Sequence, residues 1–138
     1  MLERIGVTVD VGCGWESLPS WCKVLYPKII GIYADGLEFS EEEWRVVLGY
    51  DHVNTLNLSD TNITMNQIIR IAEFPQLREV SLENTSVGDE TVDVIEQMHS
   101  LKFLSIQNTR ISEDGYHAIQ QSLPKTYIRW RRNMGNAT

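Results

Sequence analysis

The sequence predicts an α/β fold built as a solenoid, with a parallel β-sheet along one face and helices along the other. The first observation behind this prediction is an internal repeat: VNTLNLSDTNI, LREVSLENTSV and LKFLSIQNTRI follow one another at a spacing of 24 residues. The second is that each segment alternates like a strand, whereas the residues after it carry apolar positions at helical spacing. A unit of this length cannot bury its own apolar face, so neighbouring units must stack to supply the burial.

The register of the repeat is defined by columns of matching residues. Four columns are apolar in all three segments: Val53, Leu77 and Leu101; Leu56, Val80 and Leu104; Leu58, Leu82 and Ile106; and Ile63, Val87 and Ile111. A fifth column is threonine, at Thr61, Thr85 and Thr109. After each strand the chain turns into the interior, where a hydroxyl can satisfy backbone groups that water does not reach. We therefore expect the three threonines to have a structural role.

We expect a single domain over residues 1–138, because the length is ordinary for one domain and no Pro-, Gly- or Ser-rich stretch divides the chain. The repeat period divides this domain into about five 24-residue units behind an N-terminal cap. The expected parts are the cap (1–28), four repeats (29–52, 53–76, 77–100 and 101–124), a terminal strand (125–132) and a disordered tail (133–138).

The N-terminal part predicts a cap followed by a degenerate first repeat. Residues 5–11 alternate like an edge strand, and Trp15 and Trp21 are large enough to cover the end of the core. The first repeat, IIGIYADGLEF, has apolar residues in register with the later repeats but has Leu37 at the threonine position.

Each strand is predicted to lead through a turn into a helix. Ser40 with Glu43, and Thr64 with Gln67, fit the capping box that marks the start of a helix. The third return segment is expected to begin its helix at residues 88–89. Parallel strands need crossover connections, and crossovers of this kind are right-handed. The strands should therefore line one face of the stack and the helices the other.

With LxxLxLxxTxI followed by a helix start, the repeats resemble the bacterial leucine-rich-repeat family that has Thr at the position where better-known members have Asn. The match covers about residues 29–130. The ending YHAIQQSLPKTYIRW is similar to the closing unit of that family, and the opening resembles its N-terminal cap. The resemblance implies a curved or nearly straight solenoid used for protein recognition, with no cofactor and no shared catalytic residue.

Composition and charge disfavour two classes of partner. The formal net charge of -7 opposes the phosphate attraction on which nucleic-acid binding depends, and it disfavours an anionic membrane surface likewise. No apolar run approaches the roughly 18 residues of a membrane span. No signal-peptide pattern precedes the first strand, so we expect a cytoplasmic protein in which Cys13 and Cys22 are free. A disulfide within the cap is the alternative.

The residues between the buried strand positions are expected to point outward on the sheet side. They form three columns: Gly31, Thr55, Glu79, Phe103 and Tyr127; Tyr33, Asn57, Ser81, Ser105 and Arg129; and Asp35, Ser59, Glu83, Gln107 and Arg131. Phe103 and Tyr127 should then lie on adjacent strands, beside Glu79. Exposed aromatic residues next to charge are typical of the centre of a protein interface. The alternative is that the aromatic pair only covers the C-terminal end of the stack.

These columns predict a protein-binding sheet face. Its candidate residues are Tyr33, Glu79, Glu83, Phe103, Tyr127 and Arg129. The predicted function is a non-catalytic protein-protein interaction module, and the alternative is a structural or regulatory subunit whose active component lies on another chain. We expect a monomer. The acidic run at residues 41–43 and the arginines near the C-terminus make weak head-to-tail self-association the alternative to that state.

Catalytic and metal chemistry are not favoured. From the strand rise, Glu79 and Glu83 should lie about 13 Å apart, beyond the roughly 5 to 9.5 Å at which paired glycosidase carboxylates work. The three histidines, His52, His99 and His117, fall in two loops and on a helix, and the two cysteines lack CxxC spacing. We therefore expect no catalytic residue, no metal and no cofactor.

Overall fold

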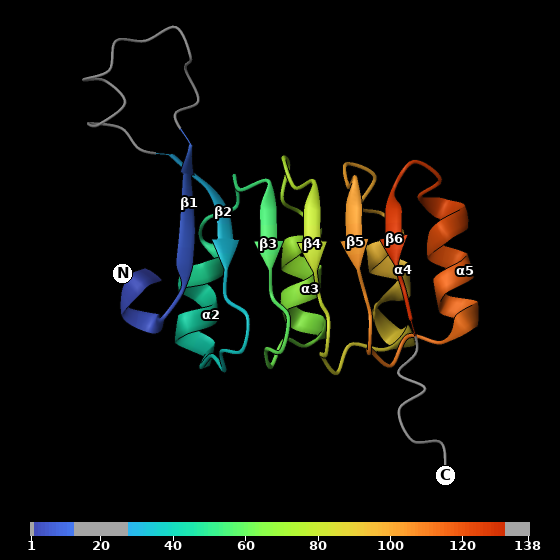
Figure 1. Cartoon of the computed structure of the whole chain (residues 1–138), viewed down its shortest axis with the longest axis horizontal. Helices are drawn as coiled ribbons and strands as arrows, with labels where there is room; N and C mark the ends of the chain where they lie inside the picture. Colours follow the sequence, from blue (N-terminus) through green and yellow to red (C-terminus); the bar gives the residue numbers. More distant parts are fainter. Residues whose placement is uncertain (1, 13–27, 132–138) are drawn as a thin grey trace, which may run out of the picture.

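The computed structural model describes residues 2–12 and 28–131, and in it one six-stranded sheet runs the length of the molecule with helices beside it (Figure 1). The strands are β1 (Thr8–Gly12), β2 (Lys28–Tyr33), β3 (Thr55–Asn57), β4 (Glu79–Ser81), β5 (Phe103–Ser105) and β6 (Tyr127–Arg129). The α-helices are α2 (Glu41–Leu48), α3 (Met65–Ile71), α4 (Val92–Ile95) and α5 (Glu113–Ser122), and the 3-10 helices are η1 (Leu2–Ile5) and η2 (Asp89–Thr91).

The strands follow one another across the sheet in the order of the chain. From β2 to β6 every pair is parallel, and the register advances by one 24-residue step, so that Leu56 pairs with Val80 and Val80 with Leu104. The helices keep the same order, because α2 contacts α3, α3 contacts α4 and α4 contacts α5. The structure is therefore an α/β fold with a mostly parallel sheet, as the sequence predicted.

The first strand is the exception to the parallel order. β1 pairs antiparallel with β2, and the register shifts between Asp10 and Val11. It begins three residues later than predicted, because Leu2–Ile5 forms a 3-10 helix that buries Leu2 before the strand starts. The edge position agrees with the prediction. The rest of the predicted cap, including both tryptophans and both cysteines, lies outside the described residues, as does the predicted tail at 133–138.

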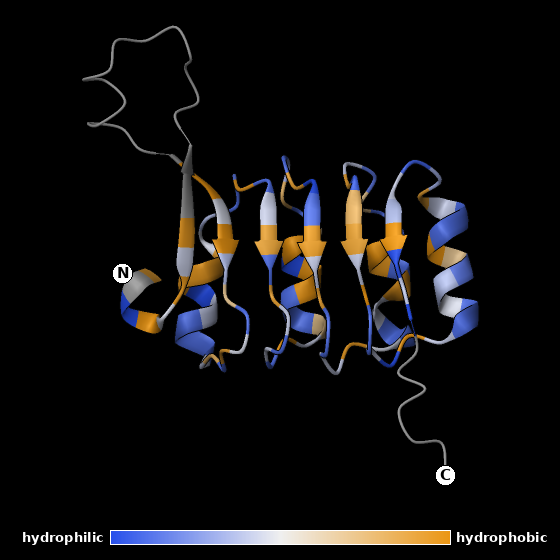
Figure 2. Ribbon diagram, viewed as in Figure 1, coloured by the Kyte–Doolittle hydropathy of each residue, from blue (hydrophilic) through white to orange (hydrophobic). Residues whose placement is uncertain are grey.

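The hydrophobic core lies between the sheet and the helices. All twelve residues of the four apolar columns are buried, and none exposes more than 2% of its surface. Figure 2 shows the apolar residues as a band across the middle of the parallel strands. The degenerate first repeat joins this core through Ile32 and Phe39, and the Phe39 ring packs edge-on against Trp44 at a centroid distance of 4.8 Å.

The turns after the strands depend on two adjacent columns. The hydroxyls of Thr61, Thr85 and Thr109 donate to the carbonyl oxygens three residues earlier, at 2.7, 2.7 and 2.8 Å. This confirms that each threonine satisfies a backbone group of its turn. The residues just before them have a left-handed backbone, with φ of 56° at both Asp60 and Asn84, a conformation that Asp, Asn and Gly adopt most readily.

The first turn differs for a physical reason. Its left-handed residue is Gly36, with φ of 77°, and Leu37 follows where the later repeats have threonine. The Leu37 side chain lies beside Gly6 and packs against the core, so the apolar residue fills space at the N-terminal end of the stack.

The first two return segments begin their helices with the predicted capping boxes, and the fourth begins its helix with a serine cap. The Ser40 hydroxyl accepts from the Glu43 N–H, and the Glu43 carboxylate accepts from the Ser40 N–H. The Gln67 side chain accepts from the N–H of Thr64 at 2.8 Å. In the fourth segment, the Ser112 hydroxyl accepts from the N–H of residue 115.

The third return segment is not the helix that the sequence predicted. A 3-10 turn over Asp89–Thr91 precedes a four-residue α4. Side chains form hydrogen bonds with the backbone there. The Thr91 hydroxyl donates to the Gly88 carbonyl at 2.8 Å, and the Glu90 carboxylate accepts from the Gly88 N–H at 3.1 Å. Such local hydrogen bonds compete with the α-helical pattern and shorten the helix. None of the helices in the described ranges is both long and apolar enough to cross a membrane.

Burial predicts the effect of a charge in the core. Leu82 exposes 1% of its surface in the middle of the stack, so Leu82→Asp should lower the free energy of unfolding by several kcal/mol and unfold a domain of ordinary stability. Ile69→Asp is the matched control, because Ile69 is 44% exposed on α3. Circular-dichroism melts of both variants provide the measurement. A Leu82→Asp melt equal to that of the control would contradict the repeat register.

The threonine column predicts a smaller effect. Thr85→Val keeps the side-chain shape but leaves the buried carbonyl of Leu82 without its donor, so we expect a loss of about 1 to 3 kcal/mol in urea unfolding. Thr8→Val on β1 is the control and should change stability by less than about 0.5 kcal/mol, because the Thr8 side chain is exposed. If the Thr85 variant unfolds at or above the parent urea midpoint, the hydroxyl does not support the turn.

Candidate functional site

The outward side of the sheet carries the candidate residues in the predicted columns. Thr55 pairs with Glu79, Glu79 with Phe103 and Phe103 with Tyr127, so this row crosses four strands. In the next row, Ser105 pairs with Ser81 on one side and with Arg129 on the other. The register therefore places Glu79 beside Phe103, as the sequence predicted.

An aromatic stack lies at the C-terminal end of this face. The rings of Phe103 and Tyr127 are stacked at a centroid distance of 5.9 Å and an interplanar angle of 18°. Both aromatic side chains were predicted to be exposed. Tyr127 is 68% exposed, whereas Phe103 is half-buried. The difference follows from position: Phe103 has a neighbour on each side in its row, while β6 is the last strand and pairs only with β5 among the described strands.

A polar cluster of Glu83, Ser105 and Arg129 lies next to the aromatic stack. The Ser105 hydroxyl donates to Glu83 Oε1 at 2.5 Å, and Arg129 Nη1 lies 3.5 Å from the same oxygen. The side chains of Glu83 and Arg129 remain 27% and 54% exposed. An ion pair this exposed contributes little to the stability of the fold.

Two outward positions are buried, which corrects the sequence analysis. Ser105 is 0% exposed and Ser59 is 9% exposed, although both were expected to face solvent. Ser105 is covered because Glu83 reaches back to it from the neighbouring strand end. Ser59 shares a hydrogen bond of 2.8 Å with the hydroxyl of Ser81 on the next strand. Alternation along a strand predicts the direction of a side chain but not the cover that longer neighbours provide.

Tyr33 is the candidate residue that the structure separates from the others. It lies on β2 and is three strands away from Ser105 in its row, a span of roughly 14 Å at the usual strand spacing. It is half-buried. The candidate surface therefore reduces to the sheet face around the aromatic stack, with Glu79, Glu83 and Arg129 beside it.

The histidines do not meet at one place. His52 lies 3.4 Å from the carboxylate of its neighbour Asp51, and His117 lies 3.7 Å from Glu113 within α5. Across residues 2–12 and 28–131, no group of three or more His, Cys, Asp or Glu side chains is placed to hold a metal ion.

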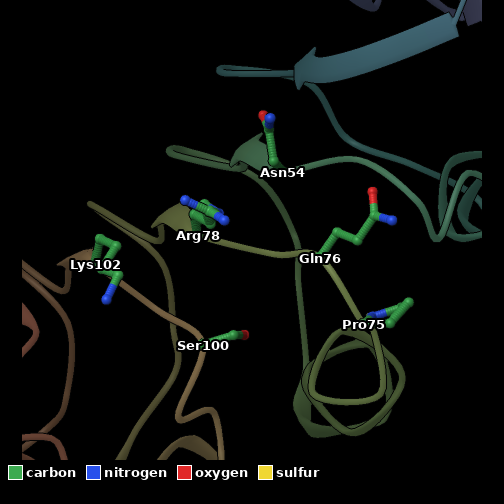
Figure 3. Close-up of a pocket in the computed structure, with 6 residues that line it drawn as sticks. All are labelled: Asn54, Pro75, Gln76, Arg78, Ser100 and Lys102. Carbon is green, nitrogen blue, oxygen red and sulfur yellow. The ribbon is translucent and has the colours of Figure 1, made fainter. Parts of the chain in front are cut away.

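A polar pocket at the other end of the strands was missed by the sequence analysis. It has a volume of about 550 Å³ and lies where the loops after α3 and α4 enter the strands (Figure 3). Its lining residues are Asn54, Pro75, Gln76, Arg78, Ser100 and Lys102. The signal was present in the repeat, because Asn54, Arg78 and Lys102 occupy the same position in three successive repeats.

No protein-family model matches the chain, and no curated protein matches it at a significant level.

The polar cluster predicts unequal roles for two serines in the same row. Ser105→Ala removes a hydrogen bond to a carboxylate and should cost about 2 kcal/mol of unfolding free energy. Ser81→Ala is the matched control and should cost about 1 kcal/mol, because the partner of Ser81 is a neutral hydroxyl. Urea unfolding of both variants measures the difference. Equal losses would show that the charge on Glu83 does not strengthen the Ser105 hydrogen bond.

Proposed function

We propose that this chain is a leucine-rich-repeat solenoid that acts as a non-catalytic protein-binding module, and that its sheet face around Phe103 and Tyr127 contacts the partner. The observation that carries the proposal is the aromatic stack, in which a tyrosine with 68% of its surface exposed lies on a half-buried phenylalanine. Tyrosine at such a position supplies a large contact area and a hydroxyl at low conformational cost.

The surroundings of the stack support an interface. Glu79 precedes Phe103 in its row, and the Glu83–Arg129 ion pair lies on the same face, so the aromatic centre has a charged border. Interfaces commonly combine a buried aromatic centre with a polar, solvent-accessible rim. A hollow of about 250 Å³ beside β6 is lined in part by Tyr127 and Arg129 and gives a partner side chain room to enter.

The scaffold supports binding at low ordering cost. The aromatic stack and the charged residues beside it lie on β4, β5 and β6 or shortly after them. Parallel pairing holds these strands in register. Their inward neighbours Val80 and Leu104 are fixed in the core. A surface that is already ordered loses little conformational entropy on binding, which leaves more of the contact energy for affinity.

The alternative role of the aromatic stack is to cover the C-terminal end of the hydrophobic core. Trp130 already contributes there, because its ring stacks on Tyr116 at 4.8 Å and its indole N–H donates to the Ile111 carbonyl at 3.3 Å. Tyr127 lies on the opposite side of the sheet and is mostly exposed, so it covers little of the core. Because Trp130 covers the end of the core and Tyr127 does not, binding is the favoured role for Tyr127.

Photo-crosslinking tests the surface directly. A photoreactive phenylalanine analogue at position 127 should capture a partner protein in the native lysate, and the same analogue at position 69 should not. Ile69 is the matched control because it is also exposed and apolar but lies on α3. Equal capture at both positions, or capture at position 69 alone, would contradict the proposed surface.

Affinity then separates binding from capping. With the captured partner purified, Tyr127→Ala should weaken binding roughly thirtyfold, since losing a central interface aromatic costs at least about 2 kcal/mol. Its melting temperature should stay near that of the parent, and Ile69→Ala should bind normally. A Tyr127→Ala variant that melts far earlier but binds as before would assign the aromatic pair to the cap.

A further inference from the structure

We infer that the pocket formed by Asn54, Pro75, Gln76, Arg78, Ser100 and Lys102 binds a carboxylate carried by an acidic segment of the protein partner. This inference rests on the proposed function, because it extends the same interface across the sheet to the start of the strands. The pocket holds two cations in a chain whose formal net charge is -7. We refer to it below as the basic pocket.

The repeat brings the two cations together. Arg78 and Lys102 each stand directly before a strand, and the Lys102 N–H donates to the Arg78 carbonyl at 2.7 Å. Their backbones are therefore adjacent, about 4.8 Å apart at the usual strand spacing. Figure 3 places Arg78 between Lys102 and Asn54, with Ser100 beside Lys102. Side chains this close can contact the two oxygens of one carboxylate together.

Neither cation is neutralised within the described residues. Both side chains are exposed, and the one salt bridge made by an arginine or lysine among the described residues joins Arg129 to Glu83 instead. None of the six residues that line the basic pocket is acidic. Two like charges side by side repel each other, and an anion between them removes that repulsion.

The other polar groups in the pocket favour the same ligand. The Asn54 side-chain carbonyl accepts from the Thr55 hydroxyl at 3.1 Å, while its amide nitrogen, a donor, makes no hydrogen bond to the described residues. The Ser100 hydroxyl donates to the Leu77 carbonyl at 2.7 Å, so its hydrogen is already used. The donors available for a ligand are thus the guanidinium, the ammonium and one amide, a set that suits an anion.

Position in the fold favours a protein carboxylate over a free small anion. Lys102 immediately precedes Phe103, and Arg78 immediately precedes Glu79, so the pocket borders the row that carries the aromatic stack. At about 550 Å³ the pocket is also far larger than one phosphate ion, and it extends across the starts of three adjacent strands, β3, β4 and β5. A partner that covers Phe103 and Tyr127 can therefore place an acidic side chain in the basic pocket at the same time.

The inference is tested with a capped hexaglutamate peptide and the full chain labelled with ¹⁵N. Titration should shift the backbone amides of Asn54, Arg78 and Lys102, and a capped hexaglutamine peptide should not. The double variant Arg78→Glu with Lys102→Glu should bind hexaglutamate about tenfold more weakly, as expected for the loss of two exposed ion pairs. Peptide shifts confined to other regions would overturn the inference.

The matched control changes the net charge equally but leaves the pocket intact. Arg45→Glu with Arg70→Glu reverses two exposed cations on α2 and α3, and this variant should retain hexaglutamate binding within about twofold. An equal loss in both double variants would show an effect of net charge only and would overturn the basic pocket. Thermal melts should show both variants folded, because all four side chains are exposed; the control should melt slightly earlier than the parent, since Arg45 and Arg70 lie in the last turns of their helices.

Two further arms separate the possible explanations. Inorganic phosphate at the same concentration should give smaller shifts at Arg78 and Lys102 than hexaglutamate does, and larger ones would assign the pocket to a small phosphate ligand instead. Tyr127→Ala should leave hexaglutamate binding unchanged, since Tyr127 does not line the basic pocket. Failure of the peptide titration together with successful crosslinking at position 127 would reject the acidic ligand while the sheet-face interface stands.

Discussion

The structure depends on one constraint: a 24-residue unit made of one three-residue strand and a short helix has too little apolar surface to form a core alone. Each unit therefore buries its apolar residues against the units on both sides, and Leu82 can be 1% exposed only because Leu58 and Ile106 occupy the same position above and below it. This requirement fixes the register, which in turn brings residues 24 apart side by side on the sheet face.

The turn after each strand makes this stacking possible at the level of the backbone. The chain must bend inward while its polar groups leave contact with water, and the threonine hydroxyls supply the missing hydrogen bonds. The left-handed residue before each threonine also connects the units, because the Asn108 amide donates to the Asn84 side chain at 2.8 Å. Each eleven-residue segment of the repeat thus contains positions that support the fold and positions on the sheet face. Only the sheet-face positions are available to contact a partner.

Much of the candidate site follows from the sequence because position in the repeat fixes position in space. The pairing of Phe103 with Tyr127, the neighbouring Glu79 and the adjacent cations of the basic pocket are all residues related by the period. Exposure does not follow in the same way. Ser105 has a residue type and a strand position typical of the surface, yet Glu83 covers it completely, because the cover comes from a long side chain whose conformation the period does not set.

The sequence by itself determined the order of the strands, their register and the apolar columns, since these repeat every 24 residues and depend on residue type alone. The tertiary structure decided the features that depend on local hydrogen bonds and on contacts between neighbouring side chains. It shortened the third helix through the hydrogen bonds of Thr91 and Glu90 with Gly88, turned β1 antiparallel, and shaped a pocket from two loops and three strand starts. Periodicity describes what is equal in every unit, whereas these features arise from what differs between units and from how side chains of different units meet.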